Sequence, residues 1–85
     1  MNQGFSCPCC GYLTLSERPP GTYEICSVCG WEDDLVQFEN PDIIGGSNSV
    51  SLNQAKINYK KMGAIEQSLL SSVRPPKAEE VPLHK

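Results

Sequence analysis

The chain carries two six-residue segments of the same form, Cys7-Pro8-Cys9-Cys10-Gly11-Tyr12 and Cys26-Ser27-Val28-Cys29-Gly30-Trp31. Each segment reads cysteine, two residues, cysteine, glycine and an aromatic residue, and we call them the first and second knuckle. A Cys-x-x-Cys turn lets two thiolates reach one ion from a single tight loop, and the glycine supplies the positive φ that turns the chain away. With fifteen residues between Cys10 and Cys26, this spacing is typical of a tetrahedral four-thiolate zinc site.

Superposing the two knuckles assigns the metal ligands. The first cysteines pair with each other, as do the second ones, whereas Cys9 pairs with Val28, which is not a metal ligand. Iron in a rubredoxin-like site uses the same ligand set, but a closed site with no evident redox partner favours zinc. For Cys9 we expect a packed side chain rather than a reactive thiol. We therefore predict one structural Zn²⁺ bound by Cys7, Cys10, Cys26 and Cys29.

The size of the chain gives the metal a structural role. A chain of 85 residues, only 39% of them hydrophobic, has a modest core and often needs a staple. Zinc binding by four thiolates contributes roughly 10–16 kcal/mol to folding, which is comparable to the whole stability of an ordinary domain, about 5–15 kcal/mol. Disulfides are the alternative, but the five cysteines are an odd number and no secretory signal precedes them. With no apolar run of membrane-spanning length either, we expect a reducing, cytoplasmic location.

The regions around the knuckles predict a small α+β zinc ribbon. Residues 12–15 and 22–25 alternate and are β-prone, and the intervening Pro19-Pro20-Gly21 is a turn signal, so we expect these segments to pair as a β-hairpin. Residues 35–38 are a candidate for a third strand. Residues 40–48 read as an irregular loop.

The second half of the chain predicts helix. Ser51 and Gln54 form a capping box, and apolar residues at helical spacing follow, so a helix is expected from about Leu52 to Lys61 and should end at Gly63. A second, short helix is a candidate at 64–72. We therefore expect one domain over residues 1–74 and an extended or disordered tail over 75–85.

The charges are distributed unevenly along the chain. Residues 1–42 carry seven acids and one base, whereas residues 43–85 carry three acids and six bases. A zinc-bearing half this acidic argues against nucleic acid as its partner, because nucleic-acid binders present basic surfaces. We predict instead a surface for a protein partner with a basic face, formed by the acidic residues that follow the second knuckle: Glu32, Asp33, Asp34, Glu39 and Asp42.

The motifs together resemble those of the CPCC family of small cysteine-rich bacterial proteins. The resemblance rests on residues 7–12, on Cys-Ser-Val-Cys-Gly-Trp-Glu-Asp-Asp at 26–34, on Gly-Gly-Ser-Asn at 45–48 and on Ser51 to Ala55 with Asn58-Tyr59. Ser27 departs from the proline that is usual there in the family, without changing a ligand. The resemblance implies no established activity.

Three functions remain to be weighed. We expect a non-catalytic, zinc-stabilised protein-interaction module, in its specific form a cognate inhibitor or immunity-type protein, because four thiolates close the metal shell and the single histidine, His84, lies next to the C-terminus. The alternative is a zinc-ribbon regulator that binds nucleic acid through the basic helical half. An enzyme using the thiol of Cys9 ranks third. The basic residues of the alternative are Lys56, Lys60, Lys61, Arg74 and Lys77.

Overall fold

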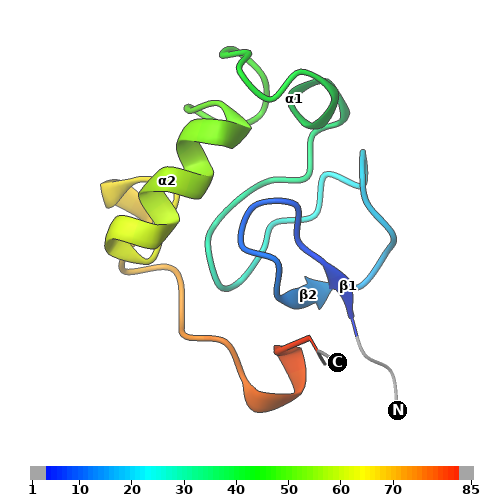
Figure 1. Ribbon diagram of the computed structural model, residues 1–85, viewed down its shortest axis with the longest axis vertical. Helices are drawn as coiled ribbons and strands as arrows, with labels where there is room; N and C mark the ends of the chain where they lie inside the picture. The colour runs from blue at the N-terminus through cyan, green and yellow to red at the C-terminus, as the bar shows by residue number, and fades with distance from the viewer. Residues whose placement is uncertain (1–3, 83–85) are drawn as a thin grey trace.

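The computed structural model describes residues 4–82 and shows a small α+β fold, as predicted (Figure 1). Two short strands, β1 (Phe5–Ser6) and β2 (Leu13–Leu15), lie on one side of the molecule, and helix α2 (Leu52–Met62) lies on the other. The remaining elements are the short helix α1 (Leu35–Glu39) and two 3-10 turns, η1 (Gln67–Leu69) and η2 (Ala78–Glu80).

The strand pairing differs from the predicted hairpin. β2 pairs antiparallel with β1, across the first knuckle, and not with residues 22–25. Residues 22–25 form no strand and contribute only an isolated antiparallel bridge, between Ile25 and Glu32, across the second knuckle. Each knuckle is thus the loop of its own short hairpin. The connections 7–12 and 16–21 both have six residues, so loop length does not decide the pairing. The knuckle turn decides it, because the hydrogen bonds of Cys7 N–H to Tyr12 and of Gly11 N–H to Cys7, both 2.9 Å, bring the residues on either side of the first knuckle together.

The predicted third strand at 35–38 is wrong, because these residues lie in helix α1. Asp34 adopts an extended conformation at the N-cap, and its Oδ1 accepts a hydrogen bond of 2.9 Å from the backbone N–H of Gln37. This cap satisfies a donor that the first helical turn leaves free. The β-propensity of a Leu-Val-x-Phe run is weaker than this local capping interaction.

The predicted helix is confirmed as α2. The Ser51 hydroxyl accepts the backbone N–H of Gln54 at 3.1 Å, and Gly63 ends the helix with φ of 90°. Leu52 and Ala55 are buried, so this face packs on the rest of the core. Only glycine adopts such a φ without strain, which explains the position of the helix end.

The predicted second helix at 64–72 is reduced to the single turn η1. Ile65 is buried, and its backbone N–H donates to the carbonyl of Cys29 at 2.9 Å. The Ile65 carbonyl accepts from Nδ2 of Asn58 at 2.8 Å. These bonds hold the chain against the second knuckle and against α2, and they use the backbone groups that a continuous helix would need.

The segment predicted as a tail contains η2, which packs against β2 (Figure 1). Arg74 and Glu80 form a bidentate ion pair, with both nitrogen–oxygen distances at 2.8 Å. Hydrogen bonding to Arg74 lowers the pKa of the Glu80 carboxyl to about 2. Residues 83–85 of the predicted tail, with His84, lie outside the described residues.

A network of buried polar side chains holds the loop between α1 and α2. Gln37 is fully buried, and its Oε1 accepts from both the backbone N–H (3.1 Å) and Nδ2 (3.0 Å) of Asn48. Asn48 also bonds both backbone groups of Glu32, at 2.8 Å each. A Cβ on Gly46 would lie 2.7 Å from Gln37 Cδ, so the loop approaches this side chain too closely for any residue but glycine.

Asn48→Ala should lower the free energy of unfolding by about 2–3 kcal/mol, because it leaves the backbone groups of Glu32 and the buried oxygen of Gln37 short of hydrogen-bonding partners. Urea unfolding of the metal-loaded chain measures this change. Asn53→Ala is the matched control, since the exposed side chain of Asn53 makes a single hydrogen bond among residues 4–82, to Asp42. Equal losses in the two variants would show that the network does not stabilise the fold.

Candidate metal centre

The four predicted ligands converge in the core. The Sγ atoms of Cys7, Cys10, Cys26 and Cys29 all lie within 4.8 Å of one another. The Cys7–Cys29 and Cys10–Cys26 sulfur pairs are each 3.7 Å apart, which suits the edge of a tetrahedron around one ion with metal–sulfur bonds of about 2.3 Å. All five cysteines are free thiols, so none of this proximity comes from disulfide bonds.

The repeat in the sequence is also a repeat in the backbone. In the first knuckle the N–H of Gly11 donates to the carbonyl of Cys7 at 2.9 Å, and in the second knuckle Gly30 donates to Cys26 at 2.9 Å. The two glycines have φ of 83° and 89°. Two turns of one geometry therefore present their cysteines to a shared centre from opposite sides.

The backbone of the knuckles also donates hydrogen bonds to the sulfurs. Cys7 Sγ accepts the N–H of Cys9 at 3.4 Å, and Cys26 Sγ accepts the N–H of Val28 at 3.4 Å. Thr14 Oγ1 lies 3.0 Å from Cys26 Sγ. Such donors stabilise thiolates, the form in which cysteine binds a metal.

The donor set therefore fits a soft or borderline metal ion. Cys7, Cys26 and Cys29 are almost completely shielded from solvent, and four thiolates fill a tetrahedral shell. Bound there, an ion would cross-link the two knuckles.

Cys9 lies outside the cluster of four sulfurs. Its side chain is buried in the same core as Leu15, Val28 and Trp31. This environment supports the expected packing role, because a reactive thiol needs solvent access and a nearby cation or base.

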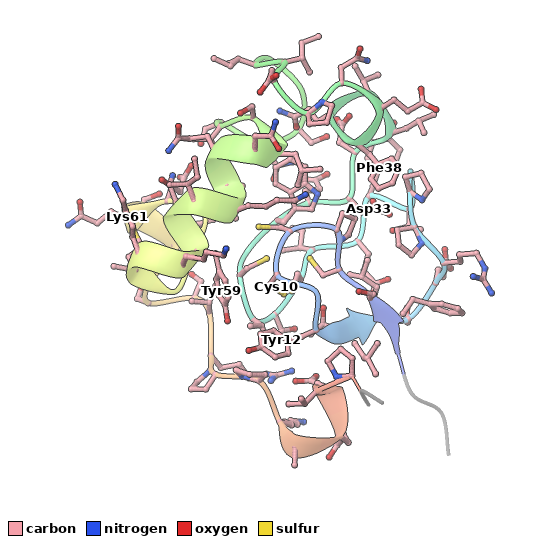
Figure 2. All side chains as sticks on the ribbon, viewed as in Figure 1. Cys10, Tyr12, Asp33, Phe38, Tyr59 and Lys61 are labelled. Atoms are coloured by element: carbon pink, nitrogen blue, oxygen red, sulfur yellow. The ribbon has the colours of Figure 1, made fainter. Side chains whose placement is uncertain are left out.

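Two tyrosines lie beside the most exposed ligand. Figure 2 shows Tyr12, which follows the first knuckle, close to Cys10 and facing Tyr59 of α2. The rings of Tyr12 and Tyr59 meet edge to face, with centroids 6.4 Å apart. Burial raises the pKa of Tyr59 to about 12, and the charge on Cys10 adds to this effect. Both residues wall the metal centre.

Two of the five residues of the predicted acidic surface are internal. Asp33 is fully buried, and its Oδ2 accepts from the backbone N–H (2.9 Å) and hydroxyl (2.8 Å) of Thr22. Asp34 is buried as the N-cap of α1, and its Oδ2 accepts from the N–H (3.0 Å) and hydroxyl (2.9 Å) of Ser47. These bonds lower the pKa of Asp34, the bond from Gln37 most of all. Asp33 and Asp34 are therefore unavailable to a partner, because they hold loops.

Other charged residues remain accessible. Glu39 and Asp42 are exposed and Glu32 is half-buried, so these three stay candidates for a contact surface. The three lysines of α2 and Lys77 are exposed, whereas Arg74 is already paired with Glu80. None of the helices in residues 4–82 has the length and apolar character that a membrane crossing requires.

The polar network around Gln37 and Asn48 was missed in the sequence. Its signal is the motif Gly45-Gly46-Ser47-Asn48, which the sequence predicts as part of an irregular loop and which also contributes to the family resemblance. Paired glycines followed by two short hydrogen-bonding side chains are typical of a loop that must pass close to buried backbone.

Cys→Ser at position 7, 10, 26 or 29 should reduce the affinity for Zn²⁺ by at least ~100-fold, more than the loss of an outer-sphere partner costs. Competition with a chromophoric chelator measures the dissociation constant. Cys9→Ser should stay within a few-fold of the parent chain. If Cys9→Ser lowers the affinity for Zn²⁺ as much as the other substitutions do, Cys9 is a ligand and the assigned ligand set is wrong.

Tyr59 should be protonated at alkaline pH values where an unfolded tyrosine, with a pKa near 10, has lost its proton. Its contribution to stability is complete below pH ~10 and is lost as the pH rises toward 12. Phenolate absorbance should show a transition near pH 12 that disappears in Tyr59→Phe. If Tyr59→Phe instead removes a transition near pH 10, this tyrosine is not shielded.

The comparisons with known proteins agree with this geometry. No curated protein matches the chain in sequence. The pattern that defines the family described as cysteine-rich CPCC matches residues 5–80, from β1 to η2, and so includes both knuckles, the polar network and α2. The chain therefore belongs to the cysteine-rich CPCC family.

Proposed function

We propose that the chain is a non-catalytic protein-interaction module whose fold is held by one structural Zn²⁺. The observation that carries this proposal is the closed cluster of four thiols in the core. A catalytic zinc keeps one position open for water or substrate, whereas a four-thiolate shell leaves none. Zinc is favoured over iron because the site is closed and has no evident redox partner.

The inventory of side chains supports a role without catalysis. The only histidine of the sequence is His84, so residues 4–82 offer no imidazole to activate a serine or cysteine. Cys9 is packed in the core rather than placed in a cleft beside a base. The buried carboxylates of Asp33 and Asp34 hold backbone and hydroxyl donors of their own loops.

The exposed residues around α1 support a protein partner. Val36 on α1 and Ile44 in the following loop are 52% and 73% exposed. Phe38 is also exposed, and the acids Glu39 and Asp42 lie in the same stretch of chain. An apolar area with carboxylates at its margin suits a protein with a basic, partly apolar face. The specific form of the proposal is a cognate inhibitor or immunity-type protein that covers such a partner.

Capture from a lysate of the source organism tests this surface. The zinc-loaded full chain should retain a partner that Glu39→Lys/Asp42→Lys fails to retain, because reversed charge repels a basic face. Lys56→Glu/Lys60→Glu, which reverses two exposed charges on α2, is the matched control and should retain it. If the first variant keeps every partner, or if no protein is captured, this proposal is wrong.

The same variants address nucleic acid. Salt-dependent binding to duplex or single-stranded oligonucleotides that is lost in Lys56→Glu/Lys60→Glu would favour the alternative regulator. A flat titration at low salt would exclude it.

A further inference from the structure

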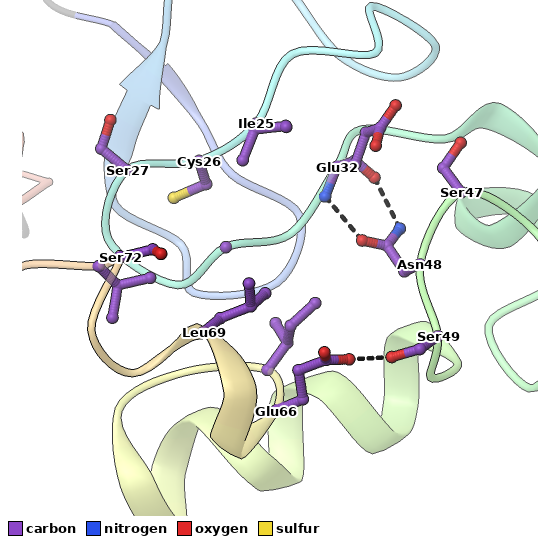
Figure 3. Close-up of a pocket in the computed structure, with 13 residues that line it drawn as sticks. Ile25, Cys26, Ser27, Glu32, Ser47, Asn48, Ser49, Glu66, Leu69 and Ser72 are labelled. Carbon is purple, nitrogen blue, oxygen red and sulfur yellow. Dashed lines mark hydrogen bonds between the residues drawn. The ribbon is translucent and has the colours of Figure 1, made fainter.

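A pocket of about 490 Å³ lies beside the second knuckle (Figure 3). Ile25 and Glu32, which flank the second knuckle, line one side, and Glu66 and Leu69 from the segment after α2 line the other. Its volume falls within the range of sites that hold small ligands or single anchoring side chains. None of the lining residues belongs to the exposed apolar stretch at α1.

The inner surface of the pocket is apolar. Ile65 and Leu69 line it together with Val73 and Gly30. Gly30 packs so closely that a Cβ there would lie 2.8 Å from Leu69 Cδ1. Ile25, at the edge of the pocket, is 62% exposed. These surfaces suit an aliphatic side chain, because burying it removes apolar area from water on both sides.

The charge at the margin is entirely negative. Glu32 and Glu66 are both among the residues that line the pocket, and no Lys or Arg is among them within the described part of the chain. Glu66 is held in place because its oxygens accept hydrogen bonds from the hydroxyls of Ser49 and Ser68. The main chain of Glu32 is fixed by Asn48 (Figure 3). The positioned carboxylate of Glu66 and the nearby negative charge of Glu32, next to an apolar surface, complement a cation carried by an apolar ligand.

A free backbone edge borders the same pocket. Ile25 and Glu32 form an isolated antiparallel bridge, flanked by the bonds of Cys26 N–H to Trp31 and of Asp33 N–H to Glu24. In such a pair the N–H and C=O of each residue point away from the partner strand. Asn48 takes those groups of Glu32, whereas within residues 4–82 those of Ile25 have no hydrogen-bonding partner. An exposed edge of this kind binds an extended polypeptide by strand addition.

We propose that this pocket binds an extended segment of a partner protein, with an aliphatic side chain between Ile25 and Leu69 and an adjacent Lys or Arg at Glu32 and Glu66. The segment would also pair with the free backbone groups of Ile25. This inference rests on the proposed interaction function and supplies a second contact. That contact is separate from the exposed residues around α1, which we call the α1 surface: Val36, Phe38, Glu39, Asp42 and Ile44.

The test is an NMR titration of the zinc-loaded, ¹⁵N-labelled full chain with the blocked tetrapeptide Thr-Leu-Lys-Thr. Amide shifts should concentrate at Ile25, Gly30, Glu66, Leu69 and Val73. The matched peptides Thr-Leu-Glu-Thr and Thr-Ala-Lys-Thr, and spermidine as a cation without the aliphatic group, should bind several-fold more weakly. Shifts elsewhere on the surface, or equal shifts with the acidic peptide or with spermidine, would overturn the proposal.

Variants separate the charge from the fold. Glu32→Gln/Glu66→Gln should raise the dissociation constant of Thr-Leu-Lys-Thr about five- to tenfold, because two rim charges are lost while the hydrogen-bonding shape is kept. Glu79→Gln, which removes an exposed carboxylate that is not part of the pocket, should leave it unchanged. Equal effects in the two variants would refute the pocket.

The outcomes for the two proposals are distinguishable. If the parent chain and Glu32→Gln/Glu66→Gln capture a partner equally well, the interaction function is supported and the proposed role of the pocket is refuted. Specific binding of Thr-Leu-Lys-Thr without any captured partner would support the pocket as a binding site and refute the α1 surface as a contact site.

Discussion

The meeting of four cysteine sulfurs within 4.8 Å is the constraint on which the rest of the structure depends. The strands that flank the first knuckle have two and three residues, and an isolated hairpin of that size is not stable in water. Without an ion, four cysteine sulfurs this close to one another are also unfavourable once they ionise, because thiolates repel each other. In the proposed zinc-loaded protein the positive charge of the metal offsets this repulsion, and its bonds to the four sulfurs cross-link the two knuckles. It fixes both knuckles, and Ile65 then ties the segment after α2 to the carbonyl of Cys29.

A second constraint is the polar network under the loop between α1 and α2. Gln37, Asn48 and Asp34 are buried and use their side chains to satisfy backbone groups that no strand or helix pairs. A loop without regular structure can pass through the interior only when its polar atoms find such partners. Asp33 and Asp34 therefore serve the fold, and their burial leaves Glu32, Glu39 and Asp42 as the candidate contact residues.

The parts of the structure that follow from local rules were predictable. The doubled knuckle indicated the four clustered cysteines, and the cap at Ser51 with Gly63 gave α2 nearly to the residue. The pairing of β2 with β1 was not predictable from β-propensity, because Phe5–Ser6 is too short to show alternation. Residues 35–38 misled because their branched and aromatic side chains favour a strand, while the deciding interaction comes from Asp34, one residue earlier. The burial of Asp33 depends on its hydrogen bonds with Thr22, eleven positions away. No local sequence pattern predicts that contact.

In this proposal the bound metal holds the fold rigid, and exposed residues on the surface of the fold recognise the partner. The most direct test of the central claim is to remove the metal from the full chain with a strong chelator under reducing conditions and record the ¹H–¹⁵N correlation spectrum. The account predicts that signals throughout the family-matched region, residues 5–80, collapse together into the narrow range of an unfolded chain, and that one equivalent of Zn²⁺ restores them. A spectrum that stays dispersed after complete removal of the metal would contradict the claim that metal binding holds this fold.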